Sequence, residues 1–123
     1  MVSITDRLTG AFNRMKLETE LERVRAEAVL YQTPVCLVLF DLDHFKNVND
    51  RFGHNAGDEV LRTFAGLVKN SIRKNDIFGR WGGEEFLLIC PNTSLKETFG
   101  LAERIRMSLA DIETLPSGKQ PLS

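Results

Sequence analysis

Four acidic residues form two pairs, and each pair stands at one end of an apolar stretch. Asp41 and Asp43 end the first stretch, and Glu84 and Glu85 begin the second. Adjacent carboxylates repel each other unless a cation lies beside them, and hard oxygen ligands from two strand ends suit Mg²⁺. Two such ions could activate an attacking hydroxyl and stabilise the leaving group in a phosphoryl-type displacement. The pattern predicts a metal site if the strands are neighbours, and solvated acidic turns if they are not.

Three polar residues between these pairs have side chains that suit a nucleotide. Lys46 is a phosphate-binding cation, and Asn49 with Asp58 could pair with the N1–H and N2–H edge of guanine. The alternative interpretation is turn chemistry at Asn49 and a favourable charge at Asp58 in the first turn of a helix. The spacing alone favours this alternative.

Arg73 and Asp76 stand three residues apart, between a predicted helix and the second acidic stretch. An arginine fork and a carboxylate could together clamp a phosphate and a base edge. An intramolecular salt bridge is the default interpretation of this common spacing. Trp81 also has two interpretations, stacking on a base or packing on the sheet, and packing is the more usual.

The composition is that of one globular domain. The chain has 123 residues, of which 42% are hydrophobic and 27% charged, and its net charge is −1. This balance argues against a nucleic-acid partner and against contact with a membrane surface. No apolar run approaches the ~18 residues of a membrane span, and the N-terminus has no signal-peptide pattern. Cys36 and Cys90 lie in apolar stretches typical of buried reduced thiols, so a cytoplasmic protein is predicted.

Apolar periodicity predicts the elements that position these residues. A helix over 14–30 has apolar residues at helical spacing, with Asn13 as its cap. The uninterrupted apolar run 35–40 is typical of a central strand buried on both faces. A second amphipathic helix is predicted over 56–73.

The second half of the chain predicts a hairpin and a further helix. The hairpin covers 77–90 and has Gly82-Gly83 at its tip, because glycine adopts positive φ at a tight reversal. Ser94 and Glu97 form a capping-box pattern before a helix over 95–112. After the leading helix, this order is that of a ferredoxin-like βαββαβ unit without its last strand. The predicted fold class is α+β, with a βαββα core and an N-terminal helix.

Taken together, these residues resemble the GGDEF family of diguanylate cyclases, in its GGEEF form. The resemblance covers nearly the whole chain in the correct order, and it implies the palm-type fold of nucleotidyl cyclases. It also implies that the chain is a single GGDEF domain, 1–123, missing its C-terminal portion. The matching segments are 6–10, 13–14, 41–46, 49–50, 52–54, 57–58, 73–76, 80–86 and 102–106.

The resemblance implies an enzyme that condenses two GTP molecules into cyclic di-GMP and releases pyrophosphate, with Mg²⁺ or Mn²⁺ as cofactor. Asp41, the Leu42 carbonyl and Glu84 would hold the metal. Glu85 would assist deprotonation of the ribose 3′-hydroxyl or share a second ion. Asp58 would favour guanine over other purines. The residues implied to contact GTP are His44, Phe45, Lys46, Asn49, Asp58, Gly82 and Gly83.

The resemblance also implies regulation and partners. Arg73 and Asp76 fall at the family's product-inhibition site, an Arg-x-x-Asp separated from the Gly-Gly by five residues, 77–81. Each family domain binds one GTP, so a homodimer is needed for catalysis, and the proximity of two nucleotides supplies much of the acceleration. The implied partners are GTP, cyclic di-GMP as product and inhibitor, a second copy of the domain, and an upstream sensory domain.

Family domains extend some tens of residues further and carry basic residues there that bind the GTP phosphates. The resemblance therefore implies that a chain of 123 residues is weak or inactive by itself, and that the strand 35–40 lacks a neighbour. An unpaired apolar edge favours an oligomer. Two other functions stay open: a receptor that binds cyclic di-GMP through Arg73 and Asp76, and a dimerisation module that binds no nucleotide.

Overall fold

The computed structural model describes residues 3–42 and 53–113 of the chain. Within them, three long helices and three strands follow one another in the order that the periodicity predicts. The elements are α1 (Arg14–Tyr31), β1 (Val35–Asp41), α3 (His54–Ser71), β2 (Ile77–Gly82), β3 (Glu85–Pro91) and α4 (Leu95–Glu113).

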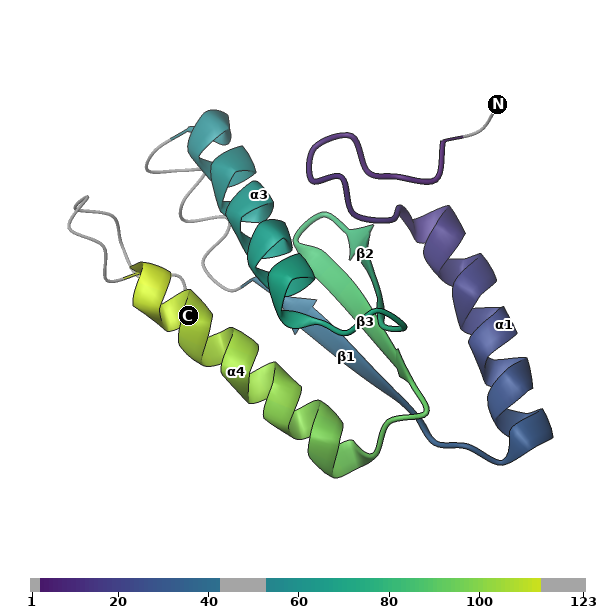
Figure 1. The fold of residues 1–123 in the computed structure, drawn as a ribbon. Coiled ribbons are helices and arrows are strands. Elements are labelled where there is room, and N and C mark those ends of the chain that lie inside the picture. The colour runs from purple at the N-terminus through teal and green to yellow at the C-terminus, as the bar shows by residue number, and fades with distance from the viewer. Residues whose placement is uncertain (1–2, 43–52, 114–123) are drawn as a thin grey trace.

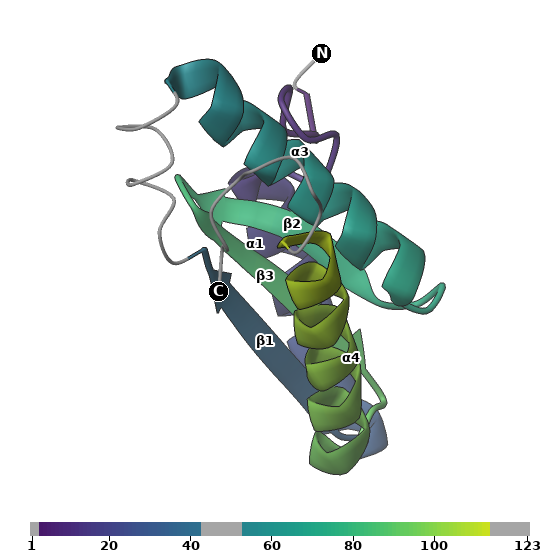
Figure 2. The same ribbon diagram turned by 90° about the vertical axis from the view of Figure 1, so that its left-hand side faces the viewer.

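The three strands form one antiparallel sheet in the order β1-β3-β2. Helices α3 and α4 cover one face of this sheet, and α1 lies on the other (Figures 1 and 2). The predicted α+β fold is confirmed, including the N-terminal helix before the first strand. The sheet therefore brings the C-terminal end of β1 beside the hairpin that joins β2 to β3.

The position of β1 in the sheet differs from what its apolar run predicts and agrees with the missing neighbour that the resemblance implies. The run 35–40 was expected to be central, but among the described residues β1 pairs only with β3, which is the central strand. The even-numbered side chains of β1 pack under the helices, whereas Leu37 and Leu39 on the other face are 50% and 58% exposed. A continuous apolar run does not reveal how many neighbours a strand has, so this pattern by itself could not distinguish a central position from an edge.

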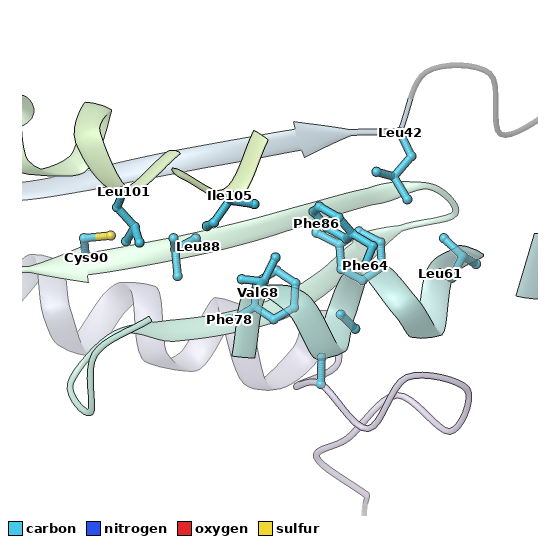
Figure 3. Packing of buried hydrophobic residues seen from close by; sticks show 12 residues of the cluster. Leu42, Leu61, Phe64, Val68, Phe78, Phe86, Leu88, Cys90, Leu101 and Ile105 are labelled. Atoms are coloured by element: carbon cyan, nitrogen blue, oxygen red, sulfur yellow. The ribbon is translucent and has the colours of Figure 1, made fainter. Parts of the chain in front are cut away.

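The larger core lies between the sheet and the two helices α3 and α4 (Figure 3). Phe64 of α3 stands at its centre and contacts aromatic rings from all three strands. Its ring centroid lies 5.2 Å from that of Phe40, 6.2 Å from that of Phe78 and 5.1 Å from that of Phe86. Ring pairs at these separations add to the free energy of burial, so this cluster fixes how α3 sits on the strands.

The helix caps follow the sequence signals. The Asn13 side chain accepts a hydrogen bond from the backbone N–H of Lys16 at 2.9 Å. At α4, the Ser94 hydroxyl accepts from the Glu97 N–H and the Glu97 carboxylate accepts from the Ser94 N–H, each at 3.1 Å. Both predicted caps are confirmed, and helix α1 ends where Gln32 adopts the left-handed conformation, with φ of 56°.

The hairpin tip lies one residue later than predicted. Gly82 still belongs to β2 and pairs with Glu85, so the turn is formed by Gly83 and Glu84. The register shifts between Arg80 and Gly82, which means that one extra residue is accommodated there as a bulge. Within the described ranges only two other glycines, Gly10 and Gly53, have positive φ, so the expected positive φ at the Gly-Gly pair was wrong.

Both cysteines are free thiols and face each other across β1 and β3. Cys36 is partly exposed and donates a hydrogen bond to the Thr93 carbonyl at 3.3 Å, whereas Cys90 is buried. Burial, reinforced by the negative charge of Asp76, raises the pKa of the Cys90 thiol to about 11. Only the thiolate is nucleophilic, so the two thiols should differ in reactivity.

We expect Cys36 to react with a disulfide reagent such as DTNB at pH 8, and Cys90 to react at least about a hundredfold more slowly. The raised pKa of Cys90 keeps most of this thiol protonated at pH 8, and burial hinders access of the reagent. The Cys36→Ser variant should lose the fast phase, and the slow phase should accelerate as the pH rises toward 11. Equal rates of reaction with DTNB for the two thiols would contradict the burial of Cys90.

Candidate functional site

The structure brings the acidic residues of the two stretches to one end of the sheet. Asp41 is the last residue of β1 and lies directly opposite Glu85, the first residue of β3. One position further, the backbone N–H of Leu42 donates to the Glu84 carbonyl at 3.1 Å. Residues more than 40 positions apart in the chain are therefore cross-strand neighbours.

The hydrogen-bond pattern fixes how close Asp41 and Glu85 are. Leu42 and Glu84 form a hydrogen-bonded pair, and such pairs alternate with non-hydrogen-bonded pairs along an antiparallel ladder. Asp41 and Glu85 thus form a non-hydrogen-bonded pair, in which the Cα atoms are typically about 4.5 Å apart and the side chains are close. Both carboxylates project from the α1 face of the sheet, the face that carries Leu87, two residues after Glu85 in β3.

Leu42 anchors this end of β1. Its side chain is buried and points into the core cluster beside Phe86 and Phe64 (Figure 3). Asp41 and Glu84 are exposed by contrast, so their carboxylates are solvated and open to a ligand. The alternation of buried and exposed residues presents acidic groups at the surface while an apolar side chain holds the backbone in place.

The donor set suits a hard divalent cation. Asp41, Glu84 and Glu85 supply carboxylate oxygens, and the segment also carries the Leu42 carbonyl. In the part of the chain that the structure describes, no three His, Cys, Asp or Glu side chains lie together as a group that could hold a metal ion. Mg²⁺ completes its octahedral shell with water and phosphate oxygens. Two or three protein oxygens at an open surface are therefore sufficient, and the residues fit this ion. Asp43 lies outside the described residues.

The residues expected to contact a nucleotide are only partly described. His44, Phe45, Lys46 and Asn49 lie outside the described residues. Asp58 is half-buried on α3, but this helix begins at His54, so Asp58 stands beyond the first turn. The expected helix-terminus charge at Asp58 was wrong because the helix begins two residues earlier than its apolar pattern.

The two glycines implied to contact GTP lie on either side of the end of β2. An added Cβ at Gly82 would lie 3.6 Å from a Glu85 carboxylate oxygen, and one at Gly83 would meet nothing within 4 Å. The backbone at the hairpin tip is consequently bare, and a ligand could approach it closely.

Arg73 and Asp76 lie at the other end of the sheet, between α3 and β2. The Asp76 carboxylate is buried and accepts a hydrogen bond from the Arg73 backbone N–H at 2.9 Å. The Arg73 guanidinium donates to the Thr93 hydroxyl at 2.8 Å, and its Nε and Nη1 lie 3.8 Å and 3.7 Å from the carboxylates of Asp76 and Glu97. The Arg73 side chain is nevertheless 55% exposed. The structure therefore contains the default salt bridge and leaves the guanidinium accessible to solvent.

Trp81 packs against α1. It belongs to the cluster on the α1 face of the sheet, and the Arg14 guanidinium lies 4.3 Å from the centroid of its ring. A cation at this distance is attracted by the face of the indole. Packing, the more usual of the two interpretations, is what the structure contains.

Sequence reasoning missed the role of Arg80. This side chain donates two hydrogen bonds to the Gly83 carbonyl, 2.9 Å from Nε and 2.7 Å from Nη2, and a third to Asp6 at 3.3 Å. Asp6 and Arg80 are 74 positions apart, so local spacing could not pair them. The only available signal was that both positions belong to segments that match the GGDEF pattern.

Within the ranges that the structure describes, none of the helices combines the length and the apolarity needed to cross a membrane.

A family model described as "Diguanylate cyclase, GGDEF domain" matches residues 3–122. The response regulator PleD of Caulobacter vibrioides is 42% identical over 123 residues, which cover 99% of this chain and 27% of PleD. The chain thus spans about a quarter of the length of this relative.

Two solved structures resemble the fold closely. The GGDEF domain of DgcB from Caulobacter crescentus, in complex with c-di-GMP, has a TM-score of 0.87 and 36% identity, over 90% of this chain and 65% of that one. The active GGEEF domain of a diguanylate cyclase from Vibrio cholerae has a TM-score of 0.82 and 37% identity, over 88% of this chain and 69% of that one.

Proposed function

Because the chain belongs to the GGDEF family of diguanylate cyclase domains, we propose that it is the catalytic unit of a diguanylate cyclase. Two GTP molecules would be condensed to cyclic di-GMP and two pyrophosphates. Residues 1–123 would belong to one GGDEF domain, which would act in the cytoplasm, where GTP and Mg²⁺ are available.

The observation that carries this proposal is the cross-strand adjacency of Asp41 with Glu84 and Glu85. Asp41, Glu84 and the Leu42 carbonyl would bind Mg²⁺ or Mn²⁺, which also binds phosphate oxygens. When bound, the ion would stabilise charge on the phosphates as the bond to pyrophosphate breaks.

Glu85 would take up the proton that the attacking hydroxyl group loses. The ribose 3′-oxygen of one nucleotide forms a bond to the α-phosphorus of the other, and the bond from that phosphorus to pyrophosphate breaks. Glu85 would accept the 3′-hydroxyl proton, because its carboxylate lies beside that of Asp41 at the end of the sheet. Each domain would hold one GTP, so two copies must face each other for both bonds to form.

Binding and turnover test the proposal separately. Calorimetry with Mg²⁺ should give at least about tenfold tighter binding of GTP than of ATP. A site whose polar groups pair with guanine would leave those groups unpaired when it binds adenine, and it therefore rejects adenine. Chromatography after incubation of the full-length protein with GTP and Mg²⁺ should show cyclic di-GMP, with a rate that rises more steeply than linearly with protein concentration. A chain that binds neither purine, or both equally, would contradict the proposal.

A second candidate function is a receptor for cyclic di-GMP, which the accessible guanidinium of Arg73 favours. The DgcB structure, which resembles this fold, was solved in complex with c-di-GMP. Arg73 offers a fork of N–H donors to a phosphate, and Asp76 would accept from a guanine edge. A receptor of this kind binds the cyclic dinucleotide and not GTP, whereas the cyclase binds both.

We expect Arg73→Ala to weaken cyclic di-GMP binding by at least about tenfold, because a charge-assisted fork is lost. The affinity of the variant for GTP should stay within about twofold of the wild-type value, since Arg73 lies at the opposite end of β3 from the acidic residues. Arg106→Ala is the matched control, because that guanidinium bonds to Glu103 on its own helix. Unchanged cyclic di-GMP affinity in Arg73→Ala, measured by calorimetry, would exclude this site.

A further inference from the structure

The segment before α1, residues 5–13, is attached to the edge of β2. We call it the N-terminal turn. Phe12 forms a parallel bridge with Gly79, its N–H donates to the Phe78 carbonyl at 3.3 Å, and its carbonyl accepts from the Arg80 N–H at 2.8 Å. Figure 1 shows this segment running from the N-terminus past β2 into the first turn of α1. Lys69 of α3 also donates to the Thr9 carbonyl at 3.2 Å.

Asp6 is fixed inside this turn. One of its carboxylate oxygens, Oδ2, accepts from the Thr9 N–H at 3.0 Å and from the Thr9 hydroxyl at 2.8 Å. The other, Oδ1, lies 3.3 Å from Nη1 of Arg80. Both side chains are about four-fifths buried, with exposures of 22% for Arg80 and 20% for Asp6. Their attraction is therefore less screened than that of a surface pair.

The other two donor groups of Arg80 hold the hairpin turn. Nε and Nη2 both donate to the Gly83 carbonyl, which belongs to the peptide group that precedes Glu84. The peptide group that follows Glu84 is held as well, because its carbonyl accepts from the Leu42 N–H. Both peptide planes around the Glu84 Cα are thus anchored, which restricts the two dihedral angles that aim its side chain.

We propose that Arg80 is a positioning residue that couples the N-terminal turn to Glu84. One guanidinium bonds to Asp6 in the turn and to the Gly83 carbonyl at the hairpin tip, so a displacement of the turn moves or releases the peptide that carries Glu84. The planar fork of arginine is suited to this bridge, and lysine cannot reproduce it. The functional consequence rests on the proposed function, in which Glu84 binds the catalytic metal.

Amide hydrogen exchange tests this bridge from Asp6 through Arg80 to the Gly83 carbonyl, which we call the brace, and it needs no nucleotide. In Arg80→Gln, the Leu42 N–H should exchange about five- to tenfold faster, because its acceptor Glu84 is no longer held from the other side. The Ile105 amide of α4 should keep its rate and serves as the internal reference for global stability. Arg80→Lys should resemble Arg80→Gln, and Arg106→Gln, whose partner is Glu103, should resemble the wild type.

Asp6→Asn separates the brace from a general loss of packing. It keeps an oxygen for the Thr9 N–H and removes the charge that faces Arg80, so Leu42 exchange should again accelerate. The Asp6→Asn/Arg80→Gln double variant should be no faster than Arg80→Gln alone. Additive effects, or an unchanged Leu42 rate in a folded Arg80→Gln protein, would overturn the proposal.

Mn²⁺ binding in the presence of GTP gives the functional readout. Affinity in Arg80→Gln should fall by about tenfold, the lower end of the range for losing a group that orients a metal ligand. If the Leu42 N–H exchanges faster in Arg80→Gln but the wild-type chain binds neither Mn²⁺ nor GTP, the structural role of Arg80 is supported and the proposed cyclase function is contradicted. If the wild type binds both and Arg80→Gln binds them equally well, the assignment stands and the coupling to Glu84 fails.

Discussion

Glu84→Gln in the full-length protein is expected to reduce cyclic di-GMP formation by two to three orders of magnitude, the range seen when one group that stabilises transition-state charge is removed. The substitution preserves size and removes the negative charge from a residue that we propose as a metal ligand. Glu84 is exposed at a two-residue turn, and its carbonyl bond to the Leu42 N–H does not involve the side chain. Stability should therefore change by no more than about 0.5 kcal/mol.

Two measurements separate this effect from a loss of folding. Thermal unfolding should be the same for Glu84→Gln and the wild type, whereas Mn²⁺ binding in the presence of GTP should be at least about tenfold weaker. Glu18→Gln is the matched control, because Glu18 is an exposed carboxylate on α1 that pairs with Arg14 in an adjacent turn. A Glu84→Gln variant with wild-type turnover would remove the metal-ligand role, and equal losses in Glu18→Gln would indicate an unspecific charge effect.

The parts of the fold that depend on local physics could be predicted from the sequence. Helix α1 begins after Asn13 and α4 after Ser94, because a side-chain acceptor satisfies the free N–H groups of each first turn. The hairpin also followed, whereas the meeting of Asp41 with Glu85 was predicted only on the condition that the two acidic stretches belong to neighbouring strands, which they do.

What could not be predicted depends on contacts between distant segments. The apolar pattern of β1 does not state its number of neighbours, and Leu37 and Leu39 are exposed although their types favour burial. The bulge near Trp81 moved the turn by one residue, because an inserted residue leaves the pattern of flanking strands intact. The bond between Asp6 and Arg80 joins residues that have no local relation.

Gly79→Ala should lower the free energy of unfolding by about 3 kcal/mol, the upper part of the range for an overpacked site. Gly79 lies in β2 where the N-terminal turn and α1 meet the sheet. An added Cβ there would lie 2.6 Å from Cγ of Leu17, 2.6 Å from the Phe12 carbonyl oxygen and 2.7 Å from Cδ1 of Leu17. Neither neighbour can yield easily, because Leu17 is fully buried and the Phe12 carbonyl accepts from the Arg80 N–H.

Chemical denaturation of Gly79→Ala beside Gly100→Ala checks this expectation. An added Cβ at Gly100 of α4 meets nothing within 4 Å, so alanine there should stabilise the protein by about 0.5–1 kcal/mol through helix propensity. Wild-type stability in Gly79→Ala would show that the turn and α1 do not pack against β2 as described. If the variant relieves the clash by releasing the Phe12 carbonyl, the Arg80 amide loses its acceptor and should exchange faster. The Leu42 amide should then accelerate with it, because displacing the N-terminal turn also withdraws Asp6 from Arg80.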